Sequence, residues 1–424
     1  MDYKLGLAFA KEADQNDSLA QYRGEFHLPL QEDGRPYVYM CGNSLGLQPK
    51  RTKQYIEQEL VDWKNLGVEG HFHAKHPWMP YHEFLTEKMA KLVGAHSKEV
   101  VVMNTLSVNL HLMMVSFYRP TSTRHKIVIE SDAFPSDKYA VESQIKFHGY
   151  DPSESLIELT PRAGEELLRE EDIQRVIQEE GDQIALIMIG NTNYYTGQFF
   201  DMKKIAHWGH EKGCIVGFDC AHGAGNCILN LHESGVDFAV WCSYKYINSG
   251  PGSLGGVFVH ERHLENKDLP RFSGWWGHEK DTRFKMRDDF SPIPTAEGWQ
   301  LSNPPILSMA AIMASLDIFD EAGINNLRQK AIQLTGYMEF LLDELNNENI
   351  KIITPRNPQE RGSQLSIQVK NADKKLFELI TADGVIADWR EPDVIRVAPV
   401  ALYNSFEDVY QFVQILSNNL SKMN

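Results

Sequence analysis

Three short segments of the sequence carry side chains whose chemistry could be combined. Lys245 follows the apolar run VDFAVWCS, Asp219 closes the run CIVGFD, and Leu106 and Ser107 follow EVVVM at the start of a helical pattern. A lysine amine can form an imine with an aldehyde, and a carboxylate can keep a ring nitrogen protonated. A hydroxyl beside the free N–H groups of a helix N-terminus can hold a phosphate. Together these groups suit pyridoxal phosphate (PLP), with Lys245 as the Schiff-base lysine.

Six short apolar runs predict the strands that must position these side chains. Such runs fit strands buried on both faces, and the amphipathic stretches between them predict helices. The alternation indicates an α/β fold with a mostly parallel sheet and helices on both sides. Functional groups in such sheets lie beyond the carboxyl ends of the strands, where Asp219 and Lys245 fall about one βα unit apart. The runs are Glu99–Met103, Lys126–Ser131, Ile184–Gly190, Cys214–Asp219, Val236–Ser243 and Gly255–His260.

The PLP hypothesis depends on the joint pattern. A single lysine after a strand is usually a solvated surface residue, and a single aspartate there is usually a cap or a turn former. Lys245, however, lies in SYKYINSGPGSLGG, where four glycines would let the backbone approach a ligand closely. These glycines are Gly250, Gly252, Gly255 and Gly256.

The C-terminal part of the chain shows a different pattern. Two long helical stretches are followed by short apolar segments and a final helix, which predicts a smaller α+β domain. We expect an N-terminal segment (residues 1–50) that packs with this small domain, a large PLP-binding domain (residues 51–305) and the small domain itself (residues 306–424).

Composition restricts the partners and the compartment. The formal net charge of -16 argues against nucleic acid or an anionic membrane as the main partner. No window approaches 18 uninterrupted apolar residues, and the first residues lack the basic start and apolar run of a secretory signal. The 5 cysteines form an odd, sparse set, which indicates reduced thiols. We therefore expect a cytoplasmic protein without a membrane span.

Eight segments spread over nearly the whole chain closely resemble kynureninase, in the order that the family has them. The last two are specific to that family within the broader aspartate-aminotransferase-like PLP fold. The segments are GNSLGLQPK (Gly42–Lys50), FPSD (Phe134–Asp137), YYTGQ (Tyr194–Gln198), FDCAHGAGN (Phe218–Asn226), WCSYKY (Trp241–Tyr246), GWWGH (Gly274–His278), LSNPPIL (Leu301–Leu307) and IRVAPVALYNSF (Ile395–Phe406).

This resemblance implies a fold, an assembly and an activity. The fold would be the aspartate-aminotransferase-like one, with a mainly parallel seven-stranded sheet and a smaller α+β domain. The protein would be a homodimer with active sites at the subunit interface. It would be a PLP-dependent hydrolase of a carbon–carbon bond in a ketone. L-kynurenine or 3-hydroxy-L-kynurenine would give anthranilate or 3-hydroxyanthranilate and L-alanine, a step of tryptophan catabolism that can feed NAD biosynthesis.

The resemblance also assigns roles to matching residues. Lys245 and Tyr244 would be catalytic, with Tyr244 also at the phosphate, and Asp219 would face the pyridinium nitrogen. Arg396 would bind the substrate carboxylate as a bidentate pair. The other expected cofactor contacts are Leu106, Ser107, Phe134, Pro135, Ser136, Asp137, His222, Trp275 and Asn303. The other expected substrate contacts are His71, Trp275 and Asn303, of which the last two would come from the partner subunit.

Two positions depart from the family pattern. Ser107 stands where the family often has threonine, and it keeps the hydroxyl. Gly190 stands where a side-chain hydroxyl is expected elsewhere in the family, so a contact there would come from the backbone or from Asn191.

Other activities occur on the same fold and require different sequence features. A cysteine desulfurase needs a nucleophilic cysteine well after the lysine, but all five cysteines precede Lys245. A PLP-binding regulator would carry a basic DNA-binding extension, and neither terminus has one. An aminotransferase shares the lysine, aspartate and arginine and stays open.

A metal-binding protein is a further alternative. Two groups of potential ligands are close in the sequence, but the cysteine spacing lacks the short C-x2-4-C pair that is usual for zinc. We therefore expect no metal. The groups are Cys214, Cys220, His222 and Cys227, and His71, His73, His76 and His82.

Overall fold

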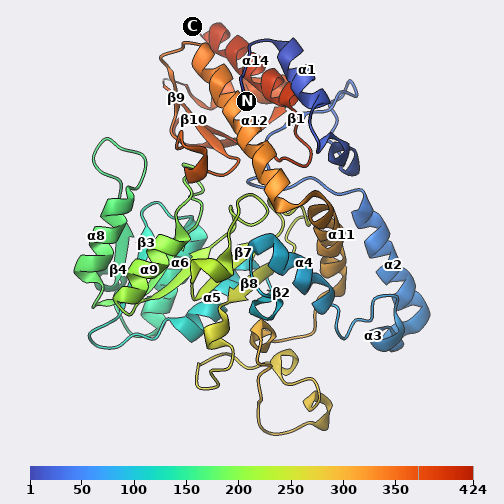
Figure 1. Ribbon diagram of the computed structural model, residues 1–424, viewed down its shortest axis with the longest axis vertical. Coiled ribbons are helices and arrows are strands. Elements are labelled where there is room, and N and C mark those ends of the chain that lie inside the picture. Colours follow the sequence, from blue (N-terminus) through green and yellow to red (C-terminus); the bar gives the residue numbers. More distant parts are fainter. Residues whose placement is uncertain (371, 424) are drawn as a thin grey trace.

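The computed structural model describes residues 1–370 and 372–423. Its centre is a seven-stranded sheet in which only the two pairings of β8 are antiparallel, which confirms the predicted α/β class with a mostly parallel sheet (Figure 1). In spatial order the strands are β2 (Val100–Met103), β8 (Gly255–Val259), β7 (Phe238–Cys242), β6 (Ile215–Asp219), β5 (Ile184–Gly190), β3 (Lys126–Glu130) and β4 (Leu156–Leu159).

Helices bury both faces of this sheet, as its apolar strands require. In β3, Ile127 and Ile129 belong to the hydrophobic cluster on one face and Val128 to the cluster on the other, because successive side chains of a strand point to opposite sides. Helices α5 (Leu106–Phe117) and α6 (Pro135–Phe147) cover the first face. The second face is covered by α4 (Glu83–Val93), α8 (Glu170–Glu180), α9 (Met202–Glu211) and α11 (Ile306–Ala322).

A second unit contains both chain termini (Figure 1). Strand β1 (Val38–Tyr39) pairs with β11 (Val385–Ile386), and α1 (Leu7–Gln15) packs against α14 (Phe406–Met423). The N-terminal segment thus packs on the C-terminal part of the chain. The unit's antiparallel sheet consists, in spatial order, of β12 (Asp388–Arg390), β13 (Val394–Val397), β10 (Leu365–Val369) and β9 (Ile350–Ile352), and its other helices are α12 (Ile324–Glu344) and α13 (Lys374–Ala382).

Helix α12 joins the two units. Its Leu327 and Ala331 pack in the core of the large sheet, whereas Leu334 and Met338 pack in the core of the second unit. The preceding helix, α11, lies against α2 (Arg51–Leu66) and α4. The residue ranges expected for the domains remain predictions.

Hydrophobic helices in this fold are internal. Helix α11 is apolar on most of its circumference because it is buried between other helices. Across residues 1–370 and 372–423, no helix has both the length and the apolar composition needed to cross a bilayer.

Candidate active site

A cavity of about 150 Å³ opens at the carboxyl ends of the parallel strands. Lys245, which follows β7, and Asp219, the last residue of β6, line it together, although 26 positions separate them in the sequence. The pairing of β6 with β7 explains this, because the carboxyl ends of neighbouring parallel strands meet at one edge of the sheet. The complete lining is Thr105, Leu106, Ser107, Glu130, Phe134, Ser136, Asp137, Gly190, Thr192, Tyr194, Asp219, Ala221, His222, Tyr244 and Lys245.

The amine of Lys245 is buried and held by aromatic neighbours. Its Nζ lies 3.2 Å from Nε2 of His222 and 5.8 Å from the centre of the Phe134 ring. Burial, and then the charge of Lys245, hold the pKa of His222 well below its usual range. His222 is therefore neutral and accepts a hydrogen bond from the amine.

Two aspartates face each other at the floor of the cavity. Burial raises the pKa of Asp219, and hydrogen bonding to Asp137 and the charge of Lys245 counteract this. For Asp137, burial and then the charge of Asp219 both raise the pKa. Asp137 therefore keeps the proton, and Asp219 carries the negative charge. Asp219 Oδ1 also accepts a 2.6 Å hydrogen bond from the N–H of Ala221.

Glu130 is a third buried carboxyl at this edge, and the sequence interpretation missed it. Both of its oxygens lie 3.1 Å from the N–H of Gly190, and burial raises its pKa to about 7. A Cβ on residue 190 would lie 2.8 Å from Glu130 Oε1, so a side chain there would press on the carboxyl. The sequence did contain the relevant pattern, because Glu130 closes an apolar run just as Asp219 does.

Two helix N-termini meet at another wall of the cavity. Ser107 lies in the first turn of α5 and Ser136 in the first turn of α6, and their hydroxyl oxygens are 2.8 Å apart. In neither helix does the side chain of the N-cap residue, Thr105 or Phe134, accept a capping hydrogen bond. Their first N–H groups and the positive ends of both helix dipoles therefore suit a phosphate.

Arg396 lies beside the cavity in β13 and reaches it through Tyr194. Its Nη1 donates to the Tyr194 carbonyl oxygen at 2.5 Å, and its guanidinium lies 5.6 Å from the centre of that ring. Asp388 Oδ1 accepts from Nε at 3.0 Å and from Nη2 at 2.8 Å. Burial lowers the pKa of Arg396, and Asp388 opposes that shift. The guanidinium plane is thus fixed before any substrate arrives.

Other predicted residues lie elsewhere in the single chain. Trp275, in η5 (Trp275–Gly277), lines a separate cavity, and Asn303 is exposed. His71, in α3 (Gly70–His73), hydrogen bonds with the carbonyl oxygen of Val68 at 2.9 Å. Pro135 begins α6 without lining the cavity.

The donor set fits PLP. Oδ1 of Asp137 is a buried atom without a hydrogen-bond partner within the described part of the chain, so an acceptor remains free beside the charged Asp219. Ser107, Ser136 and the two helix N-termini would hold the phosphate. The aspartates would hold the ring nitrogen, and Lys245 would meet the aldehyde.

Comparison with solved structures confirms the fold. A cysteine desulfurase from Thermococcus onnurineus matches with a TM-score of 0.78 at 16% identity, covering 95% of this chain and 98% of that one. A cysteine desulfurase from Escherichia coli matches with a TM-score of 0.76 at 17% identity, over 96% of this chain and 99% of the other. At such low identity these matches establish the shared architecture alone.

Comparison with sequences establishes the family. The family model described as the kynureninase C-terminal domain matches residues 327–416. Kynureninase from Koribacter versatilis is 60% identical over 97% of both chains, and that from Myxococcus xanthus is 59% identical over 97% of both. Kynureninase from Nematostella vectensis is 47% identical, over 96% of this chain and 93% of its own. The chain therefore belongs to the kynureninase family of PLP-dependent hydrolases, as the resemblance of its motifs predicted.

Proposed function

We propose that this protein hydrolyses L-kynurenine to anthranilate and L-alanine. The observation that carries the proposal is the identity of up to 60% with curated kynureninases over nearly the full chain. A cavity lined by Lys245, Asp219 and two helix N-termini supports it. The proposal extends to 3-hydroxy-L-kynurenine as a second substrate and to tryptophan catabolism and NAD biosynthesis as the context.

Lys245 is the proposed proton carrier. Bound PLP supplies a ring that accepts electrons from the substrate carbon next to the amine. The Lys245 amine would remove the proton from that carbon and would pass it to the neighbouring carbon of the cofactor. Neutral His222 holds the amine in place through its 3.2 Å contact. Asp219 keeps the ring nitrogen protonated, while Asp137 stays neutral beside it.

Tyr244 and Arg396 act on the substrate in this proposal. Burial raises the pKa of Tyr244, so its hydroxyl keeps a proton that it can donate at the carbonyl oxygen where water adds. Arg396 binds the substrate carboxylate as a planar fork, which orients the α-hydrogen perpendicular to the ring. In the structure Asp388 occupies Nε and Nη2 of this arginine, so the substrate carboxylate would share or displace that contact.

The active site is proposed to form between two subunits of a homodimer. The cavity of the single chain lacks Trp275 and Asn303, which supports their delivery from the partner subunit. The proposed compartment is the cytoplasm, and the five buried free cysteines fit its reducing conditions.

The decisive experiment is anthranilate fluorescence after kynurenine is added to the purified holoenzyme without any 2-oxo acid. A hydrolase forms anthranilate at a rate that added 2-oxo acid leaves unchanged. An aminotransferase would form none and would depend on the oxo acid, an outcome that would overturn the proposal. The same assay with 3-hydroxykynurenine ranks the two substrates by kcat/KM.

A further inference from the structure

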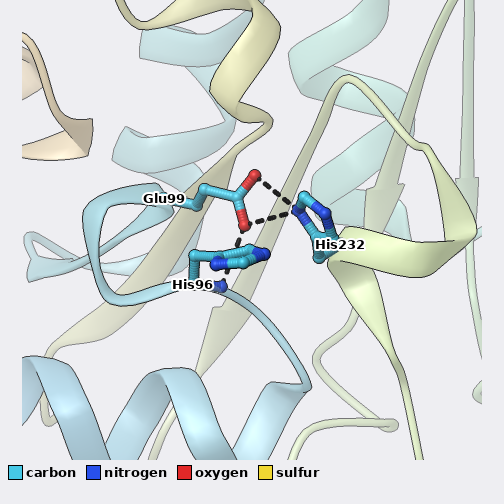
Figure 2. Close-up of side chains that lie close together, drawn as sticks. All are labelled: His96, Glu99 and His232. Atoms are coloured by element: carbon cyan, nitrogen blue, oxygen red, sulfur yellow. Dashed lines mark hydrogen bonds and ion pairs between the residues drawn. The ribbon is translucent and has the colours of Figure 1, made fainter.

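Three side chains with metal-binding atoms lie together outside the cofactor cavity, as Figure 2 shows for their mutual arrangement. His96 precedes η3 (Ser97–Glu99), Glu99 ends it, and His232 lies in α10 (Leu231–Ser234). Their ligand atoms all lie within 4.8 Å of one another. Glu99 stands directly before β2, whose other end leads to the cofactor cavity. The cluster is therefore at the amino-terminal edge of that strand, across the sheet from the active site.

We propose that His96, Glu99 and His232 bind one divalent transition-metal ion of the zinc type. Two imidazoles and one carboxylate are a preferred ligand set for such ions, whereas Mg²⁺ and Ca²⁺ require mainly oxygen ligands. Water would complete the coordination.

The spacing between His232 and Glu99 is already close to that of two ligands in a metal site. Nδ1 of His232 lies 3.0 and 3.1 Å from the two carboxylate oxygens of Glu99. Two ligands that are each about 2.0–2.2 Å from a tetrahedral zinc are roughly 3.3 Å apart. An ion can therefore replace the shared proton after a movement of a few tenths of an ångström. Binding would release that proton and would weaken as the pH falls.

Glu99 is held in place by groups that are not ligands. Its side chain is fully buried, and its two oxygens accept hydrogen bonds from the N–H of His96 at 2.9 Å and the N–H of Glu261 at 2.8 Å. Outer hydrogen bonds of this kind orient a ligating carboxylate and leave lone pairs for the metal. His96 is exposed, so an ion can enter from solvent.

His260 lies beside the cluster but is not one of the proposed ligands, because its Nδ1, 3.9 Å from Glu99 Oε1, already accepts a hydrogen bond from the N–H of Arg262 at 3.3 Å. Its ring is stacked on that of His232 with centroids 5.1 Å apart. The nearby cations are paired elsewhere: Lys98 with Glu261 at 2.8 Å, and Arg262 with Asp237 at 3.3 Å.

A second group of possible ligands shows why the first is favoured. His82, Glu83 and Glu297 are also close together, but the ammonium of Lys280 lies 2.9 Å from both Glu83 and Glu297. A lysine thus already occupies the cation position there, and we infer no metal at that place.

The test measures zinc binding by the purified holoenzyme in competition with a chromogenic chelator. His96→Asn keeps an acceptor for the Glu99 N–H, which the His96 side chain caps in the structure, but removes the imidazole. His232→Gln removes the second imidazole. His207→Gln is the matched control, because His207 faces one glutamate, Glu211, at 3.4 Å on an exposed helix.

Wild type and the His207 variant should bind one Zn²⁺ per chain with equal affinity. The two site variants should bind at least about tenfold more weakly. Zn²⁺ should also raise the melting temperature of wild type and of the control only. Equal affinity in all four proteins, or no zinc retained by wild type against the chelator, would overturn the proposal. If His232→Gln fails to fold, the zinc affinity of His96→Asn tests the proposal by itself. Kynurenine turnover without added metal then reports whether His96→Asn is folded.

Discussion

The pKa values of carboxyl groups are shifted in opposite directions at the two edges of the main sheet. At the amino-terminal edge, Asp237 accepts hydrogen bonds from His210 at 2.9 Å, His263 at 2.7 Å and the N–H of Val216 at 2.8 Å. Burial favours the neutral form of Asp237, but these hydrogen bonds outweigh it and hold its pKa well below the usual range. At the other edge, the pKa values of Asp137, Asp219 and Glu130 are all raised by burial.

The difference separates a structural edge from a functional one. Carboxylates with histidine and backbone donors are satisfied within the chain and stabilise it. Carboxyl groups that face one another across a cavity lack such partners within the chain and can interact with a bound ligand, which lowers the stability of the protein without the ligand. The four variants below test this contrast, from the largest expected effect to the smallest.

Lys245→Ala should abolish function at the cavity edge without harming the fold. We expect a loss of kynurenine turnover of at least about 10⁴-fold, because the proton carrier is gone. The visible absorbance of the holoenzyme should also disappear, while the melting temperature of the cofactor-free protein changes little. Anthranilate fluorescence and an absorption spectrum check this. Near-normal turnover would refute the assignment of Lys245.

Asp237→Asn should harm the fold at the other edge. Removing the charge leaves the histidine pair without its partner, which should lower the free energy of unfolding by about 2–4 kcal/mol. Urea unfolding followed by circular dichroism measures this. The exposed Asp33, which pairs with Arg35 on the surface, provides the control, since Asp33→Asn should change stability little. Equal effects of the two substitutions would contradict the contrast between the edges.

Arg396→Lys should weaken substrate binding, because lysine keeps the charge but loses the planar fork. We expect KM for kynurenine to rise about 10- to 100-fold with a smaller change in kcat. Arg390→Lys is a matched control, because Arg390 also lies near the Tyr194 ring, at 5.8 Å, but its side chain is far more exposed than that of Arg396. An unchanged KM in Arg396→Lys would exclude the carboxylate-binding role.

Glu130→Gln should show its effect as a change in pH dependence. The folded protein raises the pKa of Glu130 from its ordinary 4.5 to about 7 and so holds this proton more tightly than the unfolded chain does. The stability of wild type therefore falls as the pH rises between these values. The variant lacks this loss. Its free energy of unfolding relative to that of wild type should therefore rise by on the order of 1–2 kcal/mol from pH 5 to pH 8.

Melting curves of cofactor-free protein at both pH values measure this gain. The control is Glu158→Gln, which alters a carboxyl on the neighbouring strand β4 that pairs with Lys138 at 2.8 Å near the surface. A difference between variant and wild type that does not change with pH would show that the Glu130 carboxyl is not perturbed by the fold.

The sequence by itself determined the strands of the main sheet, the edge at which the key side chains lie, and the family. Apolar runs predicted the buried strands, and their ends placed Asp219 and Lys245 at one edge, because strand direction alone decides which residues emerge there. The motifs identified the family and hence the cofactor. The sequence shows that Gly190 departs from the family pattern. Its contact with Glu130 does not follow from the sequence, since a Cβ clash there depends on how β3 and β5 pair.

Tertiary structure decided which distant groups meet. Examples are the contact of Ser107 with Ser136, that of Arg396 with the Tyr194 carbonyl, and that of Glu99 with His232. The two partners of each contact come from separate segments and follow no periodicity. Side-chain pairing over such separations depends on strand order and helix packing, which a pattern along the chain does not contain. The antiparallel β8 is an example, because it alone brings His260 to the same edge as Glu99.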